Sequence, residues 1–386
     1  MENIVRVIMN LIACEVCGKE IDRTQYELSR EELEKLYELS KSHDLAHIVG
    51  NSLIKNGLVS DPELKAGFKK QIMTAVYRYE KLQYELTRLK DVLNEAKIPF
   101  IPLKGSVIRK FYPEPWLRTS CDIDVLVQEN SVDNALDVLM KKFGGKDVKR
   151  TRHDISFMTS DSVHIELHHS LIEEGRIGTA EKLLENIWDY AKPINDTFEY
   201  ELSRGMFYYY HLAHMAKHIE GGGCGIRPFL DLHLLNSNGF GDAECAGLLK
   251  AGGLDAFASA ANRLSAYWFG NGNADELSQR LEKYIVYSGV YGNNENHSAV
   301  KQIQKKSKLK YILSRLWIPY KDLILLYPSL ENRKFLLPAY EFRRWLRLTD
   351  HSMLKRKKKE LKTITSISEK KIRETDKMLS DLGLIK

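Results

Sequence analysis

The chain has few cysteines. Its 386 residues include five, and so small and odd a set argues against a disulfide framework. Cys14 and Cys17 have the spacing of a zinc-binding pair, but no clear second pair of ligands accompanies them. Two partly buried helix cysteines is therefore the favoured interpretation, with a metal or redox role as the alternative.

Long uncharged apolar runs are also lacking. No stretch approaches the ~18 residues needed to cross a bilayer, so we expect no transmembrane segment. The early apolar run at residues 4–13 is broken by Arg6 and Asn10, and no small-residue cleavage site follows a basic start. We therefore expect no signal peptide and a cytoplasmic protein.

The net charge is modest, at +6, but it is unevenly spread. Lysine-rich runs occupy residues 305–310 and 355–359. Such runs are most often solvated faces, and contact with nucleic acid or an anionic membrane surface is the alternative.

The pattern of apolar residues divides the chain into four parts. Residues 1–96 are expected to be helical, with start signals at Ser29 and at Asp61-Pro62. Residues 97–178 form an α/β core with strands at 99–103, 121–128, 153–159 and 163–168, the last two as a hairpin. Residues 179–352 are expected to be helical, with 326–348 packed against the core, and 353–386 to be a charged helical or mobile tail.

One stretch of the α/β core combines a turn with two acids. Residues 103–106 read Leu-Lys-Gly-Ser and open a short helix; after fifteen intervening residues a strand presents Asp122 and Asp124. Strand side chains alternate, so both carboxylates point to one side, where they repel. A divalent cation keeps both ionised, and hard oxygen ligands suit Mg²⁺. Backbone N–H groups at Gly105 and Ser106 favour phosphate, so the sequence predicts nucleotidyl or phosphoryl transfer.

A later strand supplies a third candidate acid. Glu166 lies between apolar neighbours, and His164 and His168 share its face. The two histidines either support the metal ligands or simply pack in the strand.

Each of these residues also has a plainer interpretation. Asp122 and Asp124 could lie on a solvated edge strand, and Glu166 could pair with Arg118 or Arg152. Lys104 is either a surface charge or a phosphate contact, which Arg118 could assist because guanidinium matches phosphate oxygens. Farther along, Arg227 and Asp231 are expected to form an i,i+4 pair.

Together these residues resemble the nucleotidyltransferase superfamily shared with DNA polymerase β. Its pattern is an apolar residue, Gly, Gly or Ser, a short helix, an apolar-flanked Asp-x-Asp, then a third acid. A narrower resemblance, to the uncharacterised nucleotidyltransferase family of bacteria, covers most of the chain. It rests on residues 43–46, 103–105, Arg118 ahead of 122–124, 166–168, 288–292, 326–330 and 336–338.

The resemblance implies an α+β fold, a polymerase β-like sheet flanked by N-terminal and C-terminal helical regions. It implies transfer of a nucleoside monophosphate from an NTP, such as ATP, to an unknown hydroxyl or phosphate acceptor. Asp122, Asp124 and Glu166 would hold Mg²⁺ (or Mn²⁺), with Asp124 or Glu166 accepting a proton, and Lys104, Gly105, Ser106 and Arg118 would contact the nucleotide. The alternatives are a catalytically silent nucleotide-binding scaffold and an RNA or membrane-surface adaptor using the basic C-terminal third. The sequence leaves open the acceptor, the nucleotide, catalytic competence and the oligomeric state.

Overall fold

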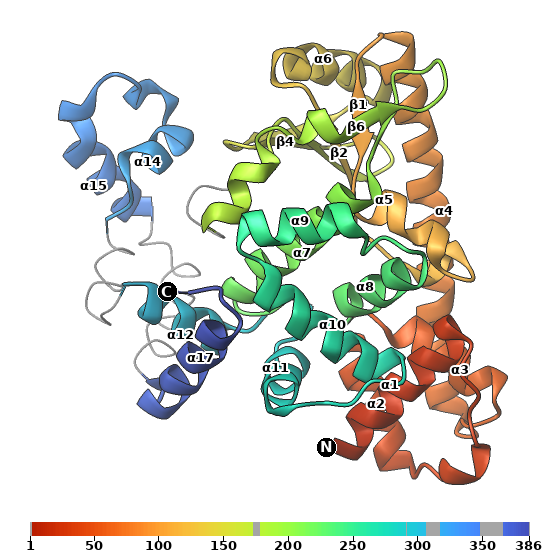
Figure 1. The fold of residues 1–386 in the computed structure, drawn as a ribbon. Coiled ribbons are helices and arrows are strands. Elements are labelled where there is room, and N and C mark those ends of the chain that lie inside the picture. Colours follow the sequence, from red (N-terminus) through yellow and green to blue (C-terminus); the bar gives the residue numbers. More distant parts are fainter. Residues whose placement is uncertain (1, 173–177, 291, 306–316, 348–365, 386) are drawn as a thin grey trace.

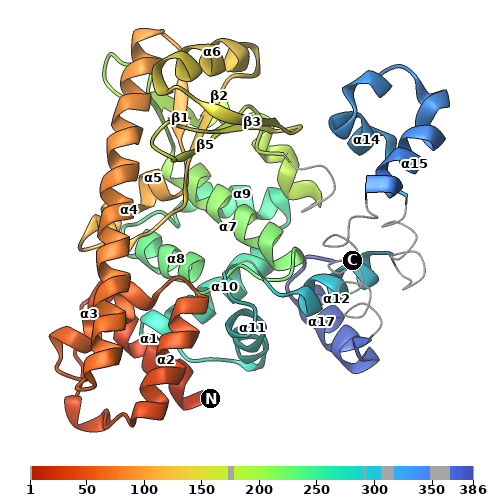
Figure 2. The ribbon, with the colours of Figure 1, turned by 180° about the vertical axis from the view of Figure 1, so that it is seen from behind.

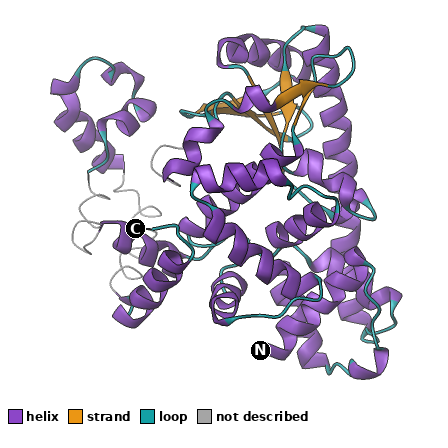
Figure 3. Ribbon diagram, in the orientation of Figure 1, coloured by secondary structure: helices purple, strands orange, loops and turns teal. Residues whose placement is uncertain are grey.

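A computed structural model describes residues 2–385 apart from 173–177, 291, 306–316 and 348–365. The fold is α+β, as expected, and Figure 3 shows the strands gathered at one end of a largely helical molecule. None of the described helices is long and apolar enough to cross a membrane.

The N-terminal part is helical, as predicted. Its helices are α1 (Glu2–Cys17), α2 (Arg30–Ser42), α3 (Ala46–Lys55) and the long α4 (Pro62–Glu95). The predicted start signals act as expected. Ser29 and Glu32 form a reciprocal capping box at α2, and the Asp61 carboxylate accepts hydrogen bonds from the first backbone N–H groups of α4.

A mixed five-stranded sheet forms the α/β core. Its order is β1 (Phe100–Pro102), β2 (Asp122–Val127), β5 (His164–His168), β4 (Asp154–Met158) and β3 (Lys146–Arg150). Strands β2 and β5 are parallel, and the other neighbours are antiparallel. The β4–β5 hairpin was predicted from the sequence. Strand β3 was not, because all five of its residues are exposed and it has no apolar alternation to reveal it.

The two faces of this sheet have different neighbours. Ile123, Val125, Ile165 and Leu167 share a buried cluster with α4 and with α6 (Val132–Phe143), which cover this face in Figure 1. Because side chains alternate along a strand, the polar residues of β2 and β5 point to the opposite face. The short helix α5 (Gly105–Ile108) follows β1.

The C-terminal helices pack with the N-terminal ones. A second buried cluster joins α1 and α3 to α7 (Arg204–Glu220), α8 (Arg227–Ser237), α9 (Ala243–Gly252), α10 (Asp255–Phe269) and α11 (Glu276–Val286). Residues 178–203 are not the helical stretch that we expected from about 179. They form short 3₁₀ turns and a small hairpin, β6 (Ala191–Pro193) and β7 (Tyr200–Leu202), since Pro193 and the polar turn that follows it interrupt a helix.

The last described segments behave in two ways. Helix α17 (Glu369–Asp381) packs against α11 and α12 (Asn294–Lys305), and Leu379 and Leu382 are fully buried there. By contrast, α14 (Tyr320–Leu326) and α15 (Leu337–Arg347) share a small core of their own. They lie apart from the main body in both Figures 1 and 2.

One ion pair, between Arg152 and Asp322 at 2.9 Å, joins this α14–α15 unit to the sheet. The expectation that residues 326–348 pack against the α/β core is wrong for its described part, residues 326–347, because this part has a core of its own. The apolar side chains of this stretch meet one another around Leu323, Tyr327 and Leu330.

Candidate active site

The three predicted acids come together on the face of the sheet opposite α4 and α6. In the parallel pairing of β2 with β5, Asp124 lies beside Glu166 and Asp122 beside His164. Asp122, His164 and Glu166 form one group whose potential ligand atoms lie within 4.8 Å of one another, and Asp124, Glu166 and His168 form another. The carboxylates thus converge because strand register and side-chain alternation bring them to one face. A solvated edge strand is excluded for Asp122 and Asp124, since β2 is paired on both sides.

Asp124 is held by two cationic partners. Lys104 Nζ lies 2.7 Å from Asp124 Oδ1, and His168 Nε2 lies 2.9 Å from the same oxygen. Burial alone would raise the pKa of Asp124, but the Lys104 ammonium and the His168 hydrogen bond outweigh it and hold that pKa below the usual range. Asp124 therefore stays ionised, and Lys104 is not a surface charge.

The pKa of Asp122 is shifted in the opposite direction from that of Asp124. Burial, and then the nearby Asp124 carboxylate, raise the pKa of Asp122 to about 6, and Lys104 offsets only part of this. Within the part of the chain that the structure describes, no side chain is hydrogen-bonded or ion-paired with its carboxylate. Added positive charge at this point would relieve the repulsion.

Glu166 is flanked by the two histidines of its own strand. Its Oε1 lies 3.7 Å from His164 Nδ1, and its Oε2 lies 3.5 Å from His168 Nε2. The alternative of an ion pair with an arginine is wrong, because Arg118 is paired with Asp231 and Arg152 with Asp322. Glu166 therefore lies on the same side of the sheet as Asp122 and Asp124.

The turn that precedes α5 is built for close packing. Lys104 has a φ of 45°, a left-handed conformation that turns the chain sharply out of β1. A side chain at Gly105 would place its Cβ 3.1 Å from Arg118 Nη1 and 3.4 Å from Ser120. A side chain here would force Arg118 or Ser120 to shift by a few tenths of an ångström, so the crowding favours glycine. The turn lies directly beside Asp124, whose carbonyl accepts the Leu103 N–H.

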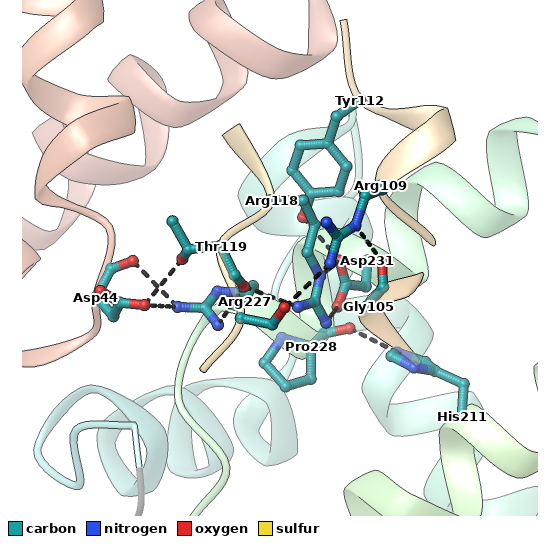
Figure 4. A network of polar contacts seen from close by, with 11 residues as sticks. Asp44, Gly105, Arg109, Tyr112, Arg118, Thr119, His211, Arg227, Pro228 and Asp231 are labelled. Carbon is teal, nitrogen blue, oxygen red and sulfur yellow. Dashed lines mark hydrogen bonds and ion pairs between the residues drawn. The ribbon is translucent and has the colours of Figure 1, made fainter. Parts of the chain in front are cut away.

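Arg109 is a residue of the turn that the sequence did not single out. Its Nε donates to the Gly105 carbonyl at 2.8 Å and its Nη2 to Ser120 Oγ at 3.1 Å (Figure 4). Its guanidinium also lies over the Tyr79 ring, 5.8 Å from the centroid. Arg109 thus joins the turn to the segment leading into β2. Its only sequence signal is a basic residue one helical turn after Gly105.

Arg118, a predicted nucleotide contact, is bound to a carboxylate from α8. Its Nη2 and Nε donate to Asp231 at 2.8 and 3.2 Å, and Tyr112 Oη donates to the same carboxylate at 2.7 Å. Asp231 is fully buried. A nucleotide contact by Arg118 would require its guanidinium to leave this carboxylate.

Arg227 is bound to the N-terminal helical part instead of to Asp231, so the expected i,i+4 pair is wrong. Its Nη2 contacts Asp44 Oδ2 at 2.5 Å, and its Nη1 donates to the Thr119 carbonyl at 3.0 Å. Thr119 Oγ1 donates to the same Asp44 oxygen at 2.8 Å. Residues 118–119, just ahead of β2, are thus bound by side chains from both helical regions (Figure 4).

The family described as "Uncharacterised nucleotidyltransferase" matches residues 29–270, more than half of the chain. The chain belongs to this family. It is an enzyme of the nucleotidyltransferase class, and the matched segment includes the whole sheet and both arginine–aspartate pairs. No match was found among curated proteins or among solved structures.

Proposed function

We propose that this nucleotidyltransferase moves a nucleoside monophosphate from an NTP to a hydroxyl or phosphate group of an acceptor and releases pyrophosphate, on a polymerase β-like fold. The observation that carries the proposal is the convergence of Asp122, Asp124 and Glu166 beside the Lys104–Gly105 turn. This places carboxylates for a cation next to groups that favour phosphate.

The residues present fit a divalent cation. Three carboxylates supply the oxygen donors that Mg²⁺ and Mn²⁺ accept, and the raised pKa of Asp122 marks a place where positive charge is favoured. Asp122, Asp124 and Glu166 would hold the ion. When bound, it neutralises charge on the triphosphate and favours ionisation of the attacking oxygen.

The turn and Lys104 would hold the phosphates. The backbone N–H of Gly105 lies at the start of α5 and would bind a phosphate oxygen, whereas the Ser106 N–H already donates to the Leu103 carbonyl at 3.1 Å. The Lys104 ammonium, part-exposed and 2.7 Å from Asp124, can contact a phosphate oxygen while it remains near that carboxylate.

Glu166 is the better candidate for the general base. The acceptor oxygen would form a bond to the α-phosphorus, the bond from that phosphorus to pyrophosphate would break, and the acceptor proton would pass to a carboxylate. Asp124 is a weak base because Lys104 and His168 keep its pKa low. Among the described residues, Glu166 has the longer contacts to His164 and His168 instead.

The test is transfer of label from each NTP. The protein is incubated with each labelled NTP, Mg²⁺ or Mn²⁺ and cell extract, and labelled product is separated from nucleotide. Asp122→Asn and Asp124→Asn should each lower transfer on the order of 10³-fold or more, since they remove charge-stabilising groups. Asp137→Asn, the same change on the exposed side of α6, is the matched control. Near-wild-type transfer by either site variant would defeat the carboxylate assignment.

A further inference from the structure

The two acid–histidine groups of the site differ in how far their charge is already compensated. In the group of Asp124, Glu166 and His168, both Lys104 and His168 contact Asp124 Oδ1. In the group of Asp122, Glu166 and His164, Asp122 has no hydrogen-bonding or ion-pairing partner among the described residues. Glu166 Oε1 lies 3.7 Å from His164 Nδ1. The second group is therefore the one that needs a cation.

This second group is also open to solvent and chemically mixed. The side chains of His164 and Glu166 are 35% and 26% exposed, so an ion can reach them from water. Mg²⁺ prefers an all-oxygen shell, whereas an imidazole nitrogen suits first-row transition ions such as Mn²⁺. One imidazole with two carboxylates is thus a donor set that discriminates between these two ions.

We infer that the cation site takes Mn²⁺ in preference to Mg²⁺, with Asp122, Glu166 and a ring nitrogen of His164 as its protein ligands. The inference rests on the cation site of the proposed function and names the ion and the nitrogen ligand. It puts His164 in the place of Asp124 in the ligand set, because Asp124 Oδ1 is already in contact with Lys104 and His168. The assignment follows from strand register, because His164 lies directly beside Asp122 and two positions before Glu166.

His168 has a different part. Its Nε2 is already engaged at 2.9 Å with Asp124 Oδ1, and its ring is almost fully buried. It orients Asp124 and keeps it ionised. It is therefore a positioning residue, and it does not supply the nitrogen ligand.

The test measures binding of Mn²⁺ itself, without nucleotide. Loss of the free-ion electron paramagnetic resonance signal gives the Mn²⁺ dissociation constant, and displacement by Mg²⁺ gives the second constant. The intact protein should bind Mn²⁺ at least tenfold more tightly than Mg²⁺. His164→Asn, which replaces the nitrogen by an amide oxygen, should lower this ratio about tenfold or more. The bound-ion spectrum should also lose its imidazole ¹⁴N coupling.

Two further variants keep the result interpretable. His153→Asn makes the same substitution on a part-exposed histidine that belongs to neither group, and it should leave the ratio and the ¹⁴N coupling unchanged. His164→Asp replaces the nitrogen by a carboxylate oxygen and should tighten Mg²⁺ binding relative to Mn²⁺. It also serves as the second variant if His164→Asn lowers the thermal midpoint of unfolding.

Three results would overturn the inference: equal affinity for the two ions, an unchanged ratio in both His164 variants, or ¹⁴N coupling that survives in His164→Asn. If the protein binds the two ions equally tightly but transfers label from an NTP with Mg²⁺, the inference is wrong and the proposed function stands. If Mn²⁺ binding depends on His164 but no NTP is turned over, the ligand assignment stands and the proposed function is wrong.

Discussion

Replacing Arg118 by methionine tests whether this residue supports the site or binds the nucleotide. The substitution removes both guanidinium contacts with Asp231 and leaves a fully buried carboxylate with the Tyr112 hydroxyl as its remaining hydrogen-bond donor. Breaking a buried pair from one side costs about 3–5 kcal/mol. Unfolding entropy of roughly 2.1 cal/mol/K per residue is about 0.8 kcal/mol/K for 386 residues that unfold as one unit. The thermal midpoint of Arg118→Met should therefore fall by about 4–6 °C.

Two companion variants sharpen this measurement. Arg118→Met combined with Asp231→Leu removes both charges and should recover most of the lost stability, because a buried pair replaced by apolar groups is often neutral. Arg263→Met breaks an ion pair whose two side chains are 48% and 45% exposed and should shift the midpoint by about 1 °C or less. An unchanged midpoint in Arg118→Met, together with a large rise in the KM for NTP, would refute the supporting role and restore Arg118 as a nucleotide contact.

Three other expectations can be checked directly. Glu166→Gln should lower transfer by about 10²–10⁴-fold, as expected for a lost general base, while labelled NTP still binds in equilibrium dialysis; unaltered turnover would exclude it as the base. Burial lowers the pKa of His47 to about 4, whereas in the unfolded chain His47 takes up its proton near pH 6.5. The stability that depends on neutral His47 is therefore complete above about pH 6.5 and is lost as the pH falls toward 4. Urea titrations should show up to roughly 3 kcal/mol of this decline, and His47→Gln should lack it; equal slopes would contradict the assignment. Leu379 of α17 is fully buried, so Leu379→Ala should lower the free energy of unfolding by about 2–5 kcal/mol in the same titration. An unchanged free energy would show that the packing of α17 does not contribute to stability.

The sequence predicted the features that depend on local pattern. Alternation placed Asp122 and Asp124 on one face of a strand, and the hairpin brought Glu166 onto the strand beside them. A helical period and capping residues predicted α2 and α4. Each of these strand, hairpin and helix signals can be read in a short stretch of neighbouring residues, so a single sequence can show it.

The rest depends on partners that are distant in the chain. Asp231 pairs with Arg118 across 113 residues, and Arg227 pairs with Asp44 across 183. Nothing local distinguishes such partners from the i,i+4 pair that we expected between Arg227 and Asp231. The apolar residues of α14 and α15 misled us for the same reason, because burial on one face does not say against what the face is buried.

The contacts that hold residues 118–119 make the α/β core depend on the helical regions. The segment leading into β2 is bound to the turn between α2 and α3 through Asp44, and to α8 through Arg227 and Asp231. A fragment cut to residues 97–178 would expose Arg118 and remove Asp231, the carboxylate that orients it. The sheet would therefore not keep its active structure if it were transferred alone into another protein. Recombination that kept the chemistry would have to carry at least residues 44–231 as one piece.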